Sequence, residues 1–324
     1  MDNYKIILGK FGDRILKDEP LAKHTYFKIG GPAKYFFEPQ TNDDFVKVVQ
    51  LCLKNNLKFL IIGNGANTIF ADGGFDGLVI KNRVEKITLV GAKGTLEKGK
   101  RTGEVFVKAT SGTLTSRLSR YTIEEGLKGF EMFVTVPGTI GGALKINAHF
   151  RPYMNEFVGN AIAEATLVDK NGELKKVNRD YFEFGYDISK LQQTGEIVAD
   201  ATFKLEGGFD PQMLWQTANQ TVLYRNSNQP VGMPCSGCIF RNIDESLAKE
   251  KGLPTTSAGY LIDQAGLKGT KIGGVQISDK HANYFLNTGN ASSKDVGELV
   301  KLVKEKVMGK FGIDLKPEVF LEGV

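Results

Sequence analysis

Residues 59–68 have the sequence Phe59-Leu60-Ile61-Ile62-Gly63-Asn64-Gly65-Ala66-Asn67-Thr68, an apolar run that leads directly into a glycine-rich loop. The run Phe59 to Ile62 has the length and composition of a buried strand. In the loop, glycines let backbone N–H groups approach phosphate oxygens closely, and the Asn and Thr side chains add further donors. A buried strand that ends in such a loop predicts a site for a phosphate-bearing ligand.

This loop differs from the dinucleotide-binding pattern Gly-x-Gly-x-x-Gly, which needs a third glycine and a long helix after it. Thr68 occupies the third glycine position, and the turn Asp72-Gly73-Gly74 follows shortly afterwards. No helix of useful length fits between the loop and that turn. The Rossmann fold is therefore excluded, and a phosphate would be held by a different kind of loop.

A second glycine-rich loop, Pro137-Gly138-Thr139-Ile140-Gly141-Gly142-Ala143, follows Val136 and is itself followed by Asn147. Pro-Gly marks a turn, and the paired glycines permit another close approach of the backbone. Taken singly, each loop is explained better by tight turns between strands. The two loops together, each fed by an apolar segment and followed by Asn, favour a pyrophosphate held without a Rossmann helix.

The regions around these loops alternate helical and strand patterns. Residues 1–20 alternate apolar and charged positions and predict an amphipathic opening helix, and Thr41 with Asp44 resembles a capping box before a second helix. A third helix carries Leu114, Leu118 and Tyr121 on one face and stops at Gly126. Short strands separated by turn signals are predicted at residues 78–80, 87–90, 105–109, 163–168 and 197–205.

The last third of the chain changes in character. Residues 210–225 predict a helix, and residues 238–286 predict a glycine-rich strand region. A strongly amphipathic helix follows, with Val296, Leu299 and Val303 in phase behind a capping box of Ser292 and Asp295. These patterns predict a separate α+β domain that begins near residue 207.

Composition narrows the class of protein. The chain has 324 residues, of which 41% are hydrophobic and 24% charged. Its net charge is +5, and its basic residues are dispersed among 37 acidic residues. A nucleic-acid-binding protein would concentrate its basic residues on one face or in one run. No apolar stretch is long enough to span a bilayer, and residues 1–20 lack the features of a signal peptide. We therefore expect a cytoplasmic protein that binds neither nucleic acid nor membrane.

The cysteines and histidines predict no metal site and no disulfide framework. Cys235 and Cys238 form a Cys-x-x-Cys pair without a second pair, and the three histidines have no metal-ligand spacing. A thioredoxin-type redox pair would be expected near a βαβ pattern at the start of a helix. Gly237 and the apolar Ile239 indicate a turn before a strand instead, and Cys235 is interpreted as a small buried hydrophobic residue.

Eight stretches in the same order along nearly the whole chain resemble the UDP-N-acetylenolpyruvoylglucosamine reductase family. They are His24-Thr25 through Ala33, Gly63 through Gly77, Gly129 through Ala148, Arg225 with Gln229-Pro230, Ser236 through Phe240, Ser257-Ala258-Gly259 through Gly269, Lys280-His281-Ala282-Asn283, and Leu315 through Val319. The resemblance implies an α/β and α+β protein with the vanillyl-alcohol-oxidase (PCMH) type of FAD-binding fold. It implies FAD subdomains at residues 1–83 and 84–206 and a substrate domain at 207–324. It matches the shorter subclass of the family. We expect this protein to be a monomer.

The resemblance also implies a reaction. NADPH reduces FAD, and the flavin passes hydride to the enolpyruvyl double bond of UDP-N-acetylglucosamine enolpyruvate, which yields UDP-N-acetylmuramate for peptidoglycan synthesis. Cys238 falls at the position of the family's proton donor, and a thiol of ordinary pKa near ~8.5 is largely protonated at neutral pH. Glu318 falls at the catalytic carboxylate. Without the resemblance, the alternative for Cys238 is simple burial beside Ile239 and Phe240, and the default interpretation of Glu318 is an exposed residue near the end of the chain.

The resemblance assigns binding residues as well. The positions expected to bind the cofactor are Gly63, Asn64, Gly65, Ala66, Asn67, Thr68, Pro137, Gly138, Thr139, Ile140, Gly141, Gly142, Ala143 and Asn147. The positions expected to bind the nucleotide sugar are Tyr186, Arg225, Arg241 and Asn242. An Arg suits bidentate binding of a diphosphate, although Arg225 considered alone is explained better by an ordinary surface position. His24 and His281 are equally explained as hydrogen-bonded structural residues, and His149 has no obvious partner.

The chain departs from the family pattern at several positions. Asp187 replaces the catalytic Arg of a Tyr-Arg-x-Ser stretch, residues 148–152 replace a small glycine-rich stretch, and Arg241-Asn242-Ile243 replaces Lys-Asn-Pro. Loss of one charge-stabilising donor typically lowers the rate by about 10²–10³. One hypothesis is that Arg151 or Lys190 supplies the missing charge. The other is a flavin- or nucleotide-sugar-binding relative, non-catalytic or regulatory, that has lost or altered the reductase reaction.

Overall fold

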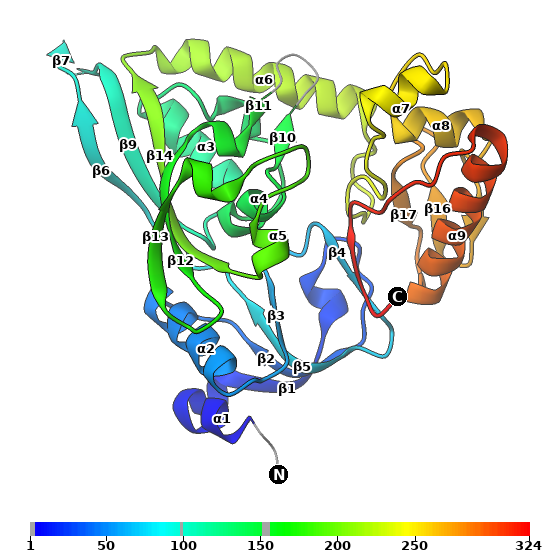
Figure 1. Cartoon of the computed structure of the whole chain (residues 1–324), viewed down its shortest axis with the longest axis horizontal. Coiled ribbons are helices and arrows are strands. Elements are labelled where there is room, and N and C mark those ends of the chain that lie inside the picture. The colour runs from blue at the N-terminus through cyan, green and yellow to red at the C-terminus, as the bar shows by residue number, and fades with distance from the viewer. Residues whose placement is uncertain (1–3, 98–99, 151–155) are drawn as a thin grey trace. The chain divides into compact units, whose positions relative to one another are not determined.

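The computed structural model describes residues 4–97, 100–150 and 156–324 (Figure 1). The chain forms two compact units, and both are discontinuous in sequence. The first unit contains Met1–Leu16, Phe36–Asn64 and Gly77–Arg225, and the second contains Lys17–Tyr35, Gly65–Asp76 and Asn226–Val324. The expected boundary between residues 206 and 207 concerns which part binds cofactor and which binds substrate, and it remains a prediction.

A five-stranded antiparallel sheet organises the first unit. Its order is β13-β12-β14-β9-β6, formed by Leu174–Asn178, Ile162–Val168, Ile197–Gly207, Gly103–Thr110 and Ile87–Lys93. Side chains alternate between the two faces of a strand, so Val105, Val107 and Ala109 of β9 all point into one core. The structure confirms the four strands of this sheet that the periodicity predicts, at residues 87–90, 105–109, 163–168 and 197–205. It also confirms the predicted strand at residues 59–62.

Short helices cover the sheet of the first unit (Figure 1). They are α2 (Asn42–Lys54), α3 (Thr115–Glu124), η3 (Glu131–Phe133), α4 (Ile140–Lys145) and α5 (Leu191–Thr194). The helix α4 contacts β9 and β14, and α2 contacts β12 and β14. The long helix α6 (Pro211–Asn228) packs Leu214 and Ala218 against Ile123 of α3.

Smaller elements complete the chain up to residue 182. They are α1 (Lys5–Phe11), η1 (Gly12–Arg14), β1 (Ile15–Pro20), η2 (Leu21–His24), β2 (Pro32–Phe37), β3 (Phe59–Ile62), β4 (Thr68–Phe70), β5 (Phe75–Lys81), β7 (Leu96–Glu97), β8 (Lys100–Arg101), β10 (His149–Phe150), β11 (Glu156–Phe157), η4 (Val158–Asn160) and η5 (Arg179–Phe182). A second sheet has the order β1-β2-β5-β3, in which β3 and β5 are parallel with Phe59 opposite Leu78.

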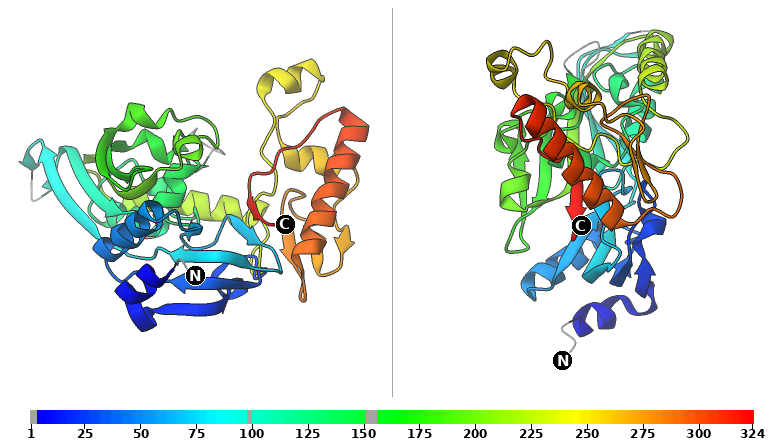
Figure 2. Two further views of the ribbon diagram at one scale, coloured as in Figure 1. Left: turned by 60° about the horizontal axis from the view of Figure 1, so that its bottom comes forward. Right: turned by 90° about the vertical axis from the view of Figure 1, so that its right-hand side faces the viewer.

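The second unit is an α+β assembly built around α9 (Ser293–Phe311), which lies beside α8 and a three-stranded sheet (Figures 1 and 2). Its elements are α7 (Glu245–Glu250), α8 (Ala258–Gln264), β15 (Lys271–Ile272), β16 (Val275–Ile277), β17 (Phe285–Asn287) and β18 (Phe320–Glu322). The buried face of α9 carries Val296, Leu299 and Val303, as its periodicity predicts. Phe27 and Ile69 from the amino-terminal part of the chain enter the same core.

Three local expectations are wrong. The opening helix ends at Phe11, because Gly12 takes a φ of 56° and a ψ of −133°, which is not a helical conformation, and η1 then leads into β1. Residues 141 and 142 lie inside the helix α4 and not in a turn. The 238–286 region contains α7 and α8 before its strands β15, β16 and β17. Ser257 caps α8 by accepting a hydrogen bond from the Tyr260 backbone, a signal that glycine content obscured.

Helix caps are largely as expected. The Thr41 hydroxyl accepts from the Asp44 backbone, but the Asp44 carboxylate binds Arg14 at 2.8 Å and so does not complete a capping box. Ser292 and Asp295 do form the expected box at α9.

No helix in the described ranges is both long enough and apolar enough to cross a membrane.

Candidate functional site

The two glycine-rich loops meet in the first unit. A Cβ atom on Gly63 would lie 2.3 Å from Oγ1 of Thr139, so the first loop packs directly against the second. Asn64 is held in place because Nη1 of Arg83 donates to its Oδ1 over 2.5 Å. The tertiary structure therefore brings together two loops that are more than seventy residues apart, as a shared phosphate site requires.

A third segment, Ser111–Gly112–Thr113 after β9, joins these loops and was missed in the sequence. The backbone N–H groups of Ile140 and Gly141 donate to the carbonyl oxygens of Thr113 (2.9 Å) and Ser111 (2.8 Å). These two amides stabilise the loop itself and are not directed at a ligand. The signal that could have revealed the segment is a glycine between hydroxyl residues at the end of a predicted strand.

Gly138 differs from its neighbours in the second loop. Its φ is +104°, and a Cβ atom placed on it would meet nothing within 4 Å. Pro137 before it and Gly142 after it are exposed, whereas Ile140 and Ala143 are buried. The side of the loop that can receive a ligand is therefore the one formed by Pro137, Gly138 and Gly142.

Buried polar atoms around the loops suit a diphosphate-bearing cofactor. Nε of Arg83, Oγ1 of Thr115 and Oγ1 of Thr135 are buried and have no hydrogen-bond partner among the described residues. A buried donor without a partner destabilises a protein by about 1–3 kcal/mol. Phosphate and ribose oxygens are the kind of acceptors that would relieve this penalty, so the first unit fits the cofactor that the sequence predicts.

The rest of the first loop, Gly65 to Thr68, belongs to the second unit. Gly65 has a φ of +65°, and a Cβ atom on it would lie 2.1 Å from the backbone oxygen of His24. The His24 ring forms an ion pair with Glu19, 3.0 Å between Nε2 and Oε1, and this hydrogen bond lowers the pKa of Glu19. His24 therefore has a structural role, which is one of the two interpretations of the sequence.

Asn67 connects this loop to the segment that carries Glu318. Its Nδ2 donates to the backbone oxygen of Glu318 (3.3 Å), and its own backbone oxygen accepts from Phe320 (3.0 Å). The strands β4 and β18 continue the connection as a parallel pair, with Phe320 opposite Thr68. The predicted cofactor loop and the predicted catalytic carboxylate are thus neighbours in one unit.

Cys238 and Glu318 lie on adjacent extended segments. The backbone N–H of Glu318 donates to the oxygen of Ile239 (2.8 Å), and Phe240 forms a bridge with Pro317. On its other side the Cys238 segment is held by Asn283, whose side chain accepts from the Phe240 N–H (2.9 Å) and donates to its oxygen (2.7 Å). The backbone segments that carry the two predicted catalytic residues, 80 positions apart, are therefore brought together.

Two buried polar atoms near Cys238 have no hydrogen-bond partner in the described part of the chain: Oγ of Ser236 and Nε of Arg241. Ser236 is only 3% exposed, and sequence inspection gave it no role. Arg241 was expected to bind the nucleotide sugar, and its unsatisfied donor suits an anionic ligand. Asn242 differs, because its Oδ1 accepts from the Ala258 backbone (3.0 Å) and so supports the start of α8.

The remaining predicted residues of the first unit lie around a turn at residues 185–188. Asn147 holds this turn: its Nδ2 donates to the oxygen of Gly185 (2.9 Å), and its Oδ1 accepts from Gly159 (3.1 Å). The Tyr186 ring lies 4.8 Å from the ring of His149.

Arg225, at the end of α6, donates from Nη1 to the backbone oxygen of Thr135, next to the second loop.

His149, left without a partner by the sequence, forms an ion pair with Asp187, 3.4 Å between Nδ1 and Oδ1. Lys190, one of the two residues suggested to supply a missing charge, binds Glu183 at 2.6 Å instead, and this hydrogen bond raises the pKa of Lys190. The other, Arg151, lies outside the described residues.

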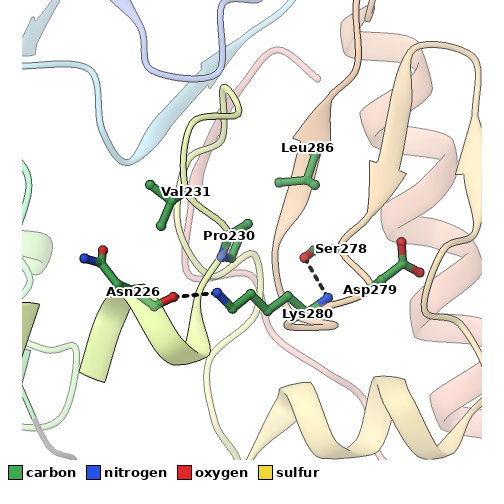
Figure 3. A pocket seen from close by; sticks show the side chains of 7 residues that line it. All are labelled: Asn226, Pro230, Val231, Ser278, Asp279, Lys280 and Leu286. Atoms are coloured by element: carbon green, nitrogen blue, oxygen red, sulfur yellow. Dashed lines mark hydrogen bonds between the residues drawn. The ribbon is translucent and has the colours of Figure 1, made fainter. Parts of the chain in front are cut away.

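A cavity of about 610 Å³ opens in the second unit. It is lined by Asn226, Pro230, Val231, Ser278, Asp279, Lys280 and Leu286. Figure 3 shows the Lys280 side chain extending to Asn226, where Nζ donates to the backbone oxygen over 2.5 Å. The neighbouring His281 packs on Tyr284, and burial lowers the pKa of His281, which favours its neutral form.

Residues 229–321 match the family described as UDP-N-acetylenolpyruvoylglucosamine reductase, C-terminal domain, and residues 33–178 match the FAD binding domain family. The UDP-N-acetylenolpyruvoylglucosamine reductase of Chlamydia felis is 36% identical over 92% of this chain and 91% of that protein. That of Clostridium perfringens is 33% identical over 100% of this chain and 98% of that protein.

A solved structure agrees. The crystal structure of the UDP-N-acetylenolpyruvylglucosamine reductase from Thermus caldophilus is 27% identical to this chain and has a TM-score of 0.72. The match covers 95% of this chain and 98% of the solved one. The predicted fold class, with an FAD-binding part of this type and an α+β part, is confirmed.

Proposed function

Because this chain belongs to the UDP-N-acetylenolpyruvoylglucosamine reductase family, we propose that it reduces UDP-N-acetylglucosamine enolpyruvate to UDP-N-acetylmuramate with FAD and NADPH. It is an FAD-dependent oxidoreductase of peptidoglycan synthesis. The observation that carries the proposal for its own residues is the position of Cys238 and Glu318 on adjacent segments, with Asn67 of the first glycine loop bonded to the backbone of Glu318.

The cofactor, when bound, supplies hydride to the enolpyruvyl carbon. The chain's own task is then to deliver a proton to the neighbouring carbon and to stabilise the negative charge that develops beside the substrate carboxylate. Sγ of Cys238 holds that proton, because a cysteine thiol is largely protonated at neutral pH. The backbone of Glu318 is fixed on the neighbouring segment by the hydrogen bond from its N–H to the oxygen of Ile239. Both residues are half-buried, which limits access of water.

The diphosphate of the cofactor is proposed to bind at the open side of the second loop, near Gly138, and at Asn64 of the first. Support comes from the empty space beside Gly138 and from the unsatisfied donor of Arg83, whose other nitrogen holds Asn64. Glycines at 63 and 141 serve the packing of the loops against each other. The cofactor-binding role is thus divided between residues that touch the ligand and residues that shape the loop.

The nucleotide sugar is proposed to bind in the second unit. Arg241, with its unsatisfied Nε, supplies an anion-binding group beside the Cys238 segment. The cavity next to Lys280 combines a cationic side chain, the hydroxyl of Ser278 and an apolar wall of Val231 and Leu286. Such a combination suits a phosphate attached to a ring.

We further propose that the protein is cytoplasmic and monomeric, and that through the cell wall it supports cell shape and division.

The first test is spectroscopic and kinetic. Purified protein should carry the absorbance bands of a flavin or acquire them when FAD is added, and it should oxidise NADPH only when the enolpyruvyl substrate is present. Protein that stays colourless after mixing with FAD contradicts the proposal for the cofactor. Flavin that NADPH reduces but the substrate does not reoxidise contradicts the proposal for the reaction.

The second outcome would favour the alternative function, a flavin- or nucleotide-sugar-binding relative without the reductase step. The sequence feature behind it is Asp187, which the resemblance places at the position of the family's catalytic Arg. Replacing the residue distinguishes the two functions. A large gain of reductase activity in Asp187→Arg from an inactive parent supports the alternative, whereas an active parent excludes it.

The proton-donor role of Cys238 gives a sharper prediction. Cys238→Ala should slow reoxidation of the reduced flavin by substrate about 10²–10⁴-fold, because general acid catalysis contributes that much, while reduction by NADPH stays unchanged. Cys238→Ser retains an exchangeable proton and should recover part of the loss. Cys235→Ala is the matched control, since Cys235 packs against the hydrophobic core of the second unit. Equal effects of the two alanine variants would contradict the assignment.

A further inference from the structure

A short row of polar and charged side chains extends from the first glycine loop within the first unit. Nη1 of Arg83 donates to Oδ1 of Asn64 over 2.5 Å, and its Nη2 lies 3.9 Å from Oε1 of Glu85. Oε2 of Glu85 in turn lies 3.5 Å from Nε of Arg117. All four residues belong to the first unit. Two arginines thus share one carboxylate, and the row carries a net positive charge.

Arg83 follows the carboxyl end of β5, which lies beside the carboxyl end of β3. These two strands are parallel, and Ile62 of β3 is opposite Lys81 of β5. The Asn82 backbone N–H donates to the oxygen of Ile62 (2.8 Å), so Arg83 comes directly after this bond. In open α/β sheets, ligands bind at the carboxyl ends of the strands. Arg83 therefore lies at the same edge as the first glycine loop, although Asn64 is 19 positions away in sequence.

The backbone on either side of Arg83 is held by buried polar side chains. Asn82 donates from Nδ2 to Oγ of Ser111 (2.9 Å), and its Oδ1 accepts from the Val84 N–H (3.2 Å). Oγ1 of Thr110 donates to the Val84 oxygen (2.7 Å). The guanidinium is thus carried by a fixed segment of backbone. Such preorganisation lowers the entropy that is lost when a ligand binds.

The guanidinium of Arg83 is only partly satisfied by the protein. Its Nε is buried and has no hydrogen-bond partner in the part of the chain that the structure describes. The 3.9 Å contact with Glu85 is too long for a hydrogen bond. The side chain as a whole is 32% exposed, so a ligand can reach it. A guanidinium is a planar fork of donors that matches paired phosphate oxygens, and such oxygens would satisfy Nε.

We propose that Arg83 binds the diphosphate of the cofactor and thereby makes the protein select FAD over riboflavin, which has the same ring system without phosphate. The inference rests on the proposed function, and it gives a role to a residue that sequence inspection did not single out. Glu85 is then a positioning residue. It orients the guanidinium without neutralising it, because Glu85 is shared with Arg117. No covalent step is involved, and Arg83 stays protonated throughout.

Flavin titration of the full-length protein tests the proposal. Arg83→Gln should raise the dissociation constant of FAD about 10–100-fold, as expected when a hydrogen bond to a charged group is lost, while that of riboflavin should change less than about twofold. Arg83→Lys keeps the charge but not the fork, so its loss should be smaller. Arg117→Gln is the matched control, because Arg117 contacts the same carboxylate but is 70% exposed, and it should bind FAD as the parent does.

Salt dependence separates direct binding from a structural role, since Arg83 also holds Asn64 in place. In the parent, the dissociation constant of FAD should rise with ionic strength, because salt screens the attraction between the guanidinium and the diphosphate. This dependence should be weaker in Arg83→Gln. In Asn64→Ala, which removes the hydrogen bond and leaves the guanidinium, it should be the same as in the parent.

Three outcomes would overturn the inference. One is an FAD dissociation constant in Arg83→Gln equal to that of the parent. Another is a loss of affinity that is the same for FAD and riboflavin. The third is an unchanged salt dependence in Arg83→Gln, which would show that Arg83 acts only through Asn64. A parent that binds no FAD contradicts the proposed function itself, so the two failures are distinguishable.

Discussion

At the scale of single residues, glycine serves two different purposes in the two loops. At Gly63 and Gly65 the absence of a side chain makes room for another part of the chain, Thr139 in one case and the backbone of His24 in the other. At Gly138 the space beside the Cα atom is empty, and the positive φ turns the backbone toward it. Only a glycine such as Gly138, with open space beside it, leaves access for a ligand.

This difference can be tested at Gly65. Gly65→Ala should lower the free energy of unfolding by at least about 2 kcal/mol, because the left-handed conformation alone destabilises alanine by about 1–2 kcal/mol and the new Cβ atom would meet a rigid backbone oxygen. Denaturant unfolding measures the effect. Gly73→Ala is the control, since nothing lies within 4 Å of that Cβ position, and its change should stay within about 0.5 kcal/mol. Similar losses in both variants would refute the packing argument.

At the scale of secondary structure, the start of α9 shows how a cap also fixes a tertiary contact. The Ser292 hydroxyl accepts from the Asp295 backbone (3.1 Å), and the Asp295 carboxylate accepts from the backbone of Ser292 (3.0 Å) and of Gly274 (3.1 Å). The last bond ties α9 to the loop between β15 and β16. One short motif in the sequence thus starts the helix and docks it on the sheet.

The pH dependence of stability follows from the same carboxylate. Hydrogen bonds from the Ser292 and Gly274 backbones hold the pKa of Asp295 below its usual range. A depressed pKa in the folded state contributes stability above the unfolded value, near ~3.9, and this contribution is lost as pH falls through the folded value. Asp295→Asn should therefore be less stable than the parent by about 0.5–2 kcal/mol at pH 7, and the difference should vanish in strong acid.

Thermal unfolding at several pH values measures this difference. Glu298→Gln is the control on the same helix, because its only described ion pair, with Lys294, is exposed and spans 3.8 Å. A deficit of Asp295→Asn that stays constant down to pH 2 would contradict the linkage.

At the scale of the whole molecule, each compact unit has its own hydrophobic core, and the second core is assembled from distant parts of the chain. Phe27, Ile29 and Ile69 are almost completely buried in it, together with residues of α8, α9 and the three-stranded sheet. The substrate part that the sequence predicts after residue 206 therefore has its core completed by segments near the amino terminus. The part of the chain after residue 206 is continuous in sequence, but its hydrophobic core is not built from that part alone.

A shortened chain tests this conclusion. Removing residues 207–324 should expose Phe27, Ile29 and Ile69, and burial of each such side chain is worth about 1.5–3 kcal/mol. We expect residues 1–206 to aggregate or to bind a hydrophobic dye strongly, while the full chain does neither. A soluble fragment that unfolds cooperatively and binds FAD would show that the expected boundary also separates autonomous folding units.

The sequence by itself determined the family, the fold class and most elements, because each of these depends on local patterns. Strand periodicity identified β9 and β14, the Ser292–Asp295 box located the start of α9, and the glycine loops pointed to a phosphate ligand without a Rossmann helix. The failures were also local: the stop of α1 at Gly12 and the helices α4 and α8 lay within glycine-rich stretches, where the periodic signal is weak, and α7 is a helix of only six residues.

The tertiary structure alone decided which distant residues meet. Nothing in the sequence spacing places the Glu318 backbone on Ile239, adds Ser111 and Thr113 to the two glycine loops, or pairs His149 with Asp187. Local patterns report the conformation of a segment and the face it buries, whereas these contacts depend on strand register and loop packing over separations of 27 to 79 residues. The candidate site is made of such contacts, so its residues could be nominated from the sequence but not assembled.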